Sequence, residues 1–104
     1  MKSYRINPNF ELKLIDRPLL RRKRGEELVE KLKVANKLLE DLEADYDIIE
    51  IDLHQATAMN KSFFLGAFGL RVKALGVTGF KSKYVFINND TIKEEIENRK
   101  ESII

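Results

Sequence analysis

The chain has 104 residues, of which 43% are hydrophobic and 35% charged, with 19 basic against 17 acidic side chains. This length fits one domain, and the content of apolar residues together with the small net charge excludes intrinsic disorder. The sequence contains no cysteine, which excludes a disulfide framework, a thiolate metal site and a cysteine nucleophile.

The first residues, MKSYRINPNFELK, lack the apolar centre of a signal peptide. We also find no apolar run that approaches the roughly 20 residues that span a bilayer, and therefore expect a cytoplasmic protein. The net charge of +2 is unevenly distributed. Residues 1–24 contain eight basic and two acidic side chains, residues 26–60 three basic and ten acidic, and residues 61–89 five basic and none acidic.

The N-terminal part, residues 1–24, is predicted to be irregular, because both prolines of the chain lie there. Short extended pieces are expected at Ser3–Ile6 and Glu11–Ile15. A helix is predicted after Gly25, and its start could reach back to Leu20. Its apolar stripe steps by four and three residues and consists of Leu28, Leu32, Ala35, Leu39 and Leu42.

The segment Asp47–Leu53 is predicted to be a buried strand, because isoleucine and leucine alternate there with acidic residues. Residues 54–61 are expected to form a loop. Ser62–Leu75 is predicted to be a second helix that Gly76 terminates. Gly66 and Gly69 are unfavourable inside a helix, and we expect them to allow close approach to a sheet.

Lys83–Asn88 is predicted to be another strand, and a last helix begins where Asp90 or Thr91 can cap it. Ile92, Ile96 and Ile103 supply the apolar stripe of this helix. The order strand, helix, strand predicts a parallel pair with a right-handed crossover. The fold class is therefore α/β, a mainly parallel sheet of about four strands with three helices, in one domain of residues 1–104.

Several short motifs follow the first predicted strand. Ser62-Phe63 opens the second helix, Phe68-Gly69 lies within it, Leu75-Gly76 ends it, and FINN, residues 86–89, precedes the last helix. With these motifs the chain resembles the STAS domain, the fold of bacterial anti-sigma factor antagonists, and more closely the STAS-like family of unknown function. The resemblance covers roughly residues 48–99.

The resemblance implies a non-enzymatic protein–protein interaction domain of a bacterium or its phage. The implied partner is a histidine-kinase-like ATPase or a sigma-regulatory protein. The implied contact surface is the loop 54–61 with the first turns of the second helix, including His54, Thr57, Asn60, Lys61, Ser62, Phe63 and Phe64.

The chain departs from the family pattern at two places. In the anti-sigma antagonists the first residue of a serine pair is phosphorylated, and Lys61 occupies that position here. In the STAS-like family acidic residues commonly follow the Ser-Phe pair, whereas Leu65 and Gly66 follow it here. We therefore expect a binder without the usual phosphorylation switch.

The residues themselves favour structural roles at several of these positions. His54 is the only histidine, with no second ligand pattern nearby, so we expect a solvent-edge or capping role and no metal or cofactor. Asn60 and Ser62 can each cap the following helix, and we expect the hydroxyl of Ser62 to be engaged in this way. Phe63, Phe64 and Phe68 are typical of a core. Three large rings exceed what one narrow helical stripe usually buries, so one of them is available for an interface.

The strongest run of charge is Arg21, Arg22, Lys23 and Arg24. Its proximity to Glu26, Glu27 and Glu30 favours a solvated, partly paired helix face. Contact with phosphate or an acidic protein is the other interpretation. The alternative function is thus weak nucleic-acid binding through this run together with Lys81 and Lys83. An enzyme is a third and weaker hypothesis, because no catalytic motif is visible.

Overall fold

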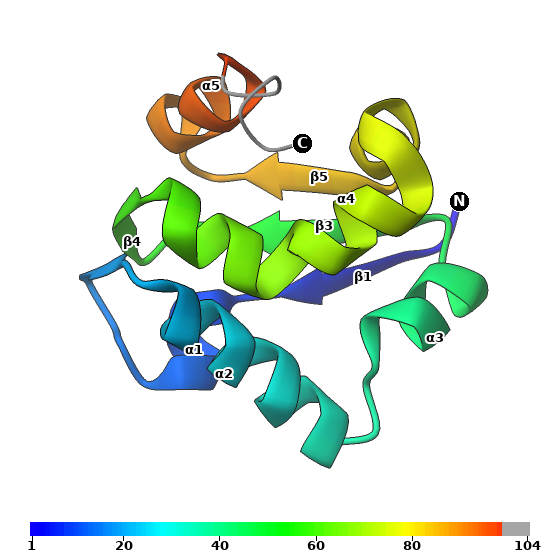
Figure 1. Cartoon of the computed structure of the whole chain (residues 1–104), viewed down its shortest axis with the longest axis horizontal. Helices are drawn as coiled ribbons and strands as arrows, with labels where there is room; N and C mark the ends of the chain where they lie inside the picture. Colours follow the sequence, from blue (N-terminus) through cyan, green and yellow to red (C-terminus); the bar gives the residue numbers. More distant parts are fainter. Residues whose placement is uncertain (99–104) are drawn as a thin grey trace.

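The computed structural model describes residues 1–98, and three parallel strands form its main sheet (Figure 1). The strands are β1 (Ser3–Ile6), β3 (Ile48–Asp52) and β5 (Tyr84–Ile87), in the order β1-β3-β5. In the register, Tyr4 lies opposite Ile49, and Ile49 lies opposite Tyr84. The α/β class and the parallel pairing of the two predicted strands are confirmed.

A second, two-stranded parallel sheet joins β2 (Arg17–Leu19) to β4 (Ala56–Met59). The prediction placed a loop at residues 54–61 and an extended piece at Glu11–Ile15, and both are wrong. Residues 56–59 carry no strand pattern of their own and become extended because the N-terminal segment pairs with them. Residues 1–98 thus form five strands in two sheets, where the prediction had about four strands in one sheet.

Five helices complete the described part of the chain: α1 (Pro8–Leu12), α2 (Arg22–Val34), α3 (Leu39–Asp45), α4 (Lys61–Lys83) and α5 (Asp90–Asn98). The irregular stretch expected near Pro8 is in fact α1. Asn7 caps it by accepting a hydrogen bond from the backbone N–H of Phe10, and Pro8 occupies its first turn.

The long helix predicted from one leucine stripe is divided into α2 and α3. Asn36 adopts a left-handed conformation with φ of 59°, which ends α2. The N–H of Lys37 then donates to the carbonyl of Leu32, and that of Asn36 to Lys33, the pattern of a Schellman motif. The four leucines of the stripe are buried in both helices, but Ala35 is exposed at the break.

The last helix is capped by Asn89, whose side chain accepts from the N–H of Ile92, and not by Asp90 or Thr91. Ile92 and Ile96 are buried as predicted. Ile103 lies outside the described residues.

The core lies between one face of the main sheet and the helix pair α2–α4, which runs side by side in front of it (Figure 1). Ile49, Ile51 and Leu53 are fully buried on the covered face. Ile48, Glu50 and Asp52, on the other face, are half-buried. Successive side chains of this strand therefore point alternately into the core and toward the other face of the sheet.

Helices α2 and α4 are in backbone contact. A Cβ on Gly66 would collide with the carbonyl group of Arg22, and a Cβ on Gly25 would lie within 3.0 Å of backbone atoms of Phe63 and Ala67. Gly66 was expected to approach a sheet, and it approaches α2 instead. A Cβ on Gly69 would meet only the side chain of Leu65, at 3.7 Å, so this glycine makes no close approach to another element.

Helix α4 is, by length and composition, apolar enough to cross a membrane, which the sequence analysis did not anticipate. Its backbone leaves helical geometry at Gly76, with φ of 77° and ψ of 164°. The helix therefore consists of two segments, 61–75 and 77–83, each shorter than the roughly 20 residues that a span requires. Gly76 breaks the helix as predicted, but a second helical segment follows it.

We predict that Gly66→Ala lowers the free energy of unfolding by about 3 kcal/mol, because the added methyl group forces two backbones apart. Gly69→Ala is the matched control. It gains the same helix propensity without a collision and should raise stability by up to about 1 kcal/mol. Urea unfolding followed by circular dichroism measures both values. Equal effects of the two substitutions would show that the helices are not in contact at Gly66.

Candidate partner-binding site

Polar side chains gather where the parallel strands end. Asp52 ends β3, and its Oδ1 accepts hydrogen bonds from the backbone N–H of His54 and from Nδ2 of Asn88, both at 2.9 Å. Asn88 follows β5 with φ of 68°, a conformation that asparagine tolerates. The carboxylate of Asp52 therefore joins the two strand ends.

The electrostatics of Asp52 follow from these contacts. Partial burial alone would raise the pKa of its carboxyl group. The hydrogen bonds from Asn88 and from the backbone of His54 outweigh that effect and hold the pKa below its ordinary value. The side chain of His54 is exposed, and its backbone contributes to the turn. Within residues 1–98 there is no group of three histidine or acidic side chains that could hold a metal ion.

Two further amides hold the loop after β3. Nδ2 of Asn89 donates to the carbonyl of Ala56 at 3.1 Å, and Nδ2 of Asn7 donates to Oε1 of Gln55 at 3.4 Å. The residues that follow β1, β3 and β5 are thus connected with one another. The loop that leads into β4 is fixed from both neighbouring strands.

Asn60 is the residue that starts α4. Its Oδ1 accepts from the N–H of Phe63 at 2.8 Å, and its own N–H donates to the carbonyl of Leu19 at 3.1 Å. Ser62 is exposed within the first turn and is not the cap. The expectation that capping would engage the hydroxyl of Ser62 is therefore wrong, because Asn60 already occupies the capping position.

The remaining predicted contact residues divide into surface and core. His54, Thr57, Lys61 and Ser62 are exposed, and Asn60 is half-buried. Phe63 is 0% exposed and Phe64 3%, and Phe68 is buried as well, so none of these rings is available on the surface. Their spacing along α4 places all three on the side that faces the sheet and α2.

The basic run lies beside the start of α4. The hydrogen bond from Asn60 to Leu19 and the contact between Arg22 and Gly66 bring the first turns of α2 and α4 together. Arg21, Arg22, Lys23 and Arg24 are all exposed. We call the exposed residues at these adjoining helix starts the entry surface: Arg21, Arg22, Lys23, Arg24, Lys61 and Ser62.

Part of this positive charge is neutralised within α2. Arg24 forms an ion pair with Glu27 at 3.0 Å, and Arg22 lies 4.0 Å from Glu26. Lys81 and Lys83 are at the opposite end of α4, and Nζ of Lys83 donates to the carbonyl of Tyr46 at 2.7 Å. The nucleic-acid hypothesis had grouped Arg21–Arg24 with these two lysines. The structure places the lysines at the far end of α4, so they do not form one surface with Arg21–Arg24.

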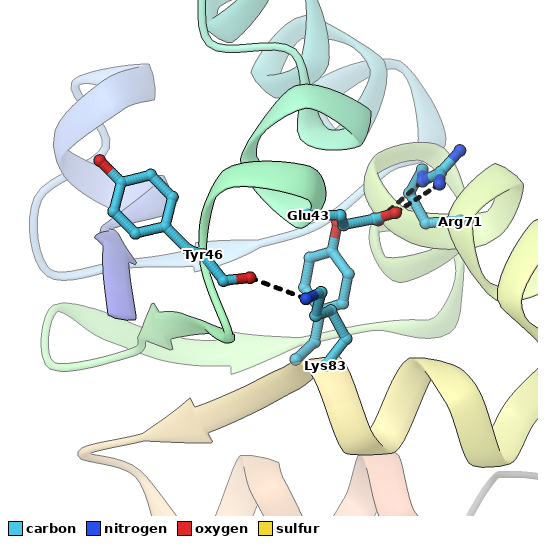
Figure 2. A network of polar contacts seen from close by, with 5 residues as sticks. Glu43, Tyr46, Arg71 and Lys83 are labelled. Atoms are coloured by element: carbon cyan, nitrogen blue, oxygen red, sulfur yellow. Dashed lines mark hydrogen bonds and ion pairs between the residues drawn. The ribbon is translucent and has the colours of Figure 1, made fainter. Parts of the chain in front are cut away.

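A buried charged network, which the sequence analysis missed, joins α3, α4 and β5 (Figure 2). Nε of Arg71 donates to Oε2 of Glu43 at 2.8 Å, and its Nη2 to Oε1. The hydroxyl of Tyr84 donates to the same carboxylate at 2.6 Å. An acidic residue in a leucine stripe and an arginine in an apolar helix were the only signals of this pairing in the sequence.

The contacts of Glu43 keep it charged. Burial would raise the pKa of its carboxyl group, but the hydrogen bonds from Arg71 and Tyr84 outweigh burial and lower the pKa. Burial, and then the hydrogen bond to Glu43, raise the pKa of the Tyr84 hydroxyl far above its ordinary value. Arg71 and Tyr84 both donate to the carboxylate of Glu43, so the network holds α3, α4 and β5 together.

No protein-family model, curated protein or solved structure matches this chain. The chemistry of the entry surface is therefore inferred from its geometry. It combines exposed positive side chains with the first turns of two helices, where the helix dipoles are also positive. The carboxylate of Asp52 and the amide of Asn60 are already committed to hydrogen bonds. Such a surface is suited to binding a negatively charged partner.

We predict that Asn60→Ala lowers the free energy of unfolding by about 1 kcal/mol, because it removes the cap of α4. Ser62→Ala, in the same turn but exposed, should change stability by less than about 0.5 kcal/mol. Thermal unfolding of both variants measures the difference. A larger loss for Ser62→Ala would reverse the assignment of the cap.

We predict that Glu43→Gln lowers stability at pH 7 by about 3 kcal/mol, because it leaves the half-buried guanidinium of Arg71 without its anion. The folded-state pKa of Glu43 lies below its ordinary 4.5, so its stabilising effect is present above that pH and is lost as the pH falls through the folded-state value. The difference between parent and variant should therefore shrink as acid is added.

Denaturant unfolding between pH 7 and pH 2 tests this pH dependence. Glu26→Gln is the control, because its pair with Arg22 is exposed and should contribute less than about 0.5 kcal/mol. A constant difference between the parent and Glu43→Gln down to pH 2 would contradict the role given to the carboxylate.

Proposed function

We propose that this chain is a STAS-like, non-enzymatic protein–protein interaction domain that binds an acidic surface of a partner protein through the entry surface. The observation that carries the proposal is the proximity of Lys61 to Arg21–Arg24 at the adjoining starts of α2 and α4. By its resemblance to the STAS-like family, the partner is a histidine-kinase-like ATPase or a sigma-regulatory protein in the bacterial or phage cytoplasm.

The charge of Lys61 is central to the proposed mode of binding. A phosphoserine would place a charge of about −1.5 to −2 at this position, whereas lysine supplies a permanent positive charge. The proposed domain is therefore a binder that is not switched at this residue. Ser62 is exposed next to it, and stoichiometric phosphate on Ser62 in cells would contradict a non-switching domain.

Nucleic acid is the alternative partner of the same basic run. Because Lys81 and Lys83 lie at the far end of α4, the proposed nucleic-acid surface would consist of Arg21–Arg24 and Lys61 alone. We expect a dissociation constant no tighter than about 1 μM for duplex DNA at physiological salt, the range of non-specific binders. Sub-micromolar binding that is lost on neutralising Arg21–Arg24 would favour nucleic acid over a protein partner.

We predict that Lys61→Glu weakens binding to the partner ATPase by at least about tenfold, because it reverses a charge within the interface. The fold should be preserved, since acidic residues are favourable in the first turn of a helix. Lys81→Glu makes the same change of charge at the exposed far end of α4 and should leave the affinity within about twofold.

Titration calorimetry with a purified ATPase of the histidine-kinase-like type measures both affinities, and circular dichroism verifies the folds. If the two variants weaken binding equally, net charge and not the entry surface governs the interaction. If Lys61→Glu binds like the parent, the proposed surface is wrong.

A further inference from the structure

A cavity of about 170 Å³ lies between the second segment of α4, strand β5 and helix α5. Gly76 puts a kink in α4, and Val77 and Phe80 of the segment that follows it line the cavity. Ile96 lines it from α5. The cavity is therefore a product of the same break that divides the helix.

The walls of the cavity are largely aromatic. Phe64, Phe80, Tyr84 and Phe86 all line it. Phe80 and Tyr84 are stacked with ring centroids 4.5 Å apart, and Phe64 meets Phe80 edge-on at 5.8 Å. The hydroxyl of Tyr84 is held by Glu43, so this residue offers its ring to the cavity. Phe64, which the resemblance to the STAS-like family placed in the partner contact, belongs to this wall.

The rim carries charge. Lys81 and Lys93 line the cavity together with Glu97, and none of the three forms an ion pair with another residue of the described range. Two ammonium groups against one carboxylate leave the rim positive. Apolar walls with a few polar groups at the edge are the usual composition of a small-molecule site.

We propose that this cavity binds a small molecule that has a benzene-sized apolar group and a carboxylate. An apolar cavity of about 150 Å³ is large enough to hold benzene, so the volume here admits one aromatic ring. The ring would contact the aromatic walls, and the carboxylate would lie between Lys81 and Lys93. The entry surface contributes no residue to this site, so the proposal is independent of the proposed function.

The test uses 3-phenylpropionate as the probe and 3-phenylpropanol as its uncharged counterpart. Methyl groups of the full chain are observed by NMR during titration with each compound. We expect saturable shifts at Val77, Val85 and Ile96, and about fivefold tighter binding of the acid than of the alcohol. Lys93→Gln should remove this preference and leave the affinity for the alcohol unchanged.

Two further variants make the test specific. Lys73→Gln, an exposed lysine on α4 that does not line the cavity, should keep the preference for the acid. Val77→Phe should fill the cavity and abolish binding of both compounds, and Val85→Phe serves the same purpose from β5 if the first variant does not fold. Binding that survives in the folded cavity-filled variant would overturn the proposal.

Other results would also overturn it. One is the absence of saturable shifts up to a ligand concentration of about 10 mM, which would be weak binding even for a fragment. The other is an equal affinity for the acid and the alcohol. Binding that is seen only after Ile103→Ser and Ile104→Ser would identify the chain's own last residues as the occupant in place of a small molecule.

Discussion

The backbone contact between α2 and α4 is the constraint on which the other features of this fold depend. Gly25 and Gly66 have no side chain, and this lets the two helices approach until their backbone atoms are in contact. At that separation Leu28 and Leu32 of α2 and Phe63 and Phe68 of α4 share one core with the sheet. A methyl group at either glycine would separate the helices and open that core.

The same contact determines where charge is found on the surface. It places Arg22 beside the first turns of α4, and the pairing of β2 with β4 then brings the segment before α2 next to Asn60. Basic residues that are about forty positions apart in the sequence, such as Arg21 and Lys61, thereby come to the same end of the helix pair. Lys81 and Lys83 are excluded from that region by the length of α4.

Local patterns predicted the elements whose signals lie within one segment. The alternation in Ile49–Leu53 and the spacing of Phe63, Phe64 and Phe68 correctly indicated a buried strand and a core-facing helix. Features that depend on distant partners were missed: β4 is extended because β2 pairs with it, and Glu43 is buried as a carboxylate because Arg71 and Tyr84 donate hydrogen bonds to it. Asn36 carried a helix-ending signal, but the continuous leucine stripe concealed it.

The strand order β1-β3-β5 also constrains how the chain folds. Each neighbouring pair in the main sheet is joined by a crossover, and Ile6 pairs with Ile51, 45 residues further along the chain. No strand can therefore find its partner through a short hairpin, and every pairing must close a long loop first. During synthesis β1 cannot pair until β3 has emerged, and β3 completes its hydrogen bonding only after all of α4 has emerged. Helices α2 and α4 are thus available to associate before the last strand exists.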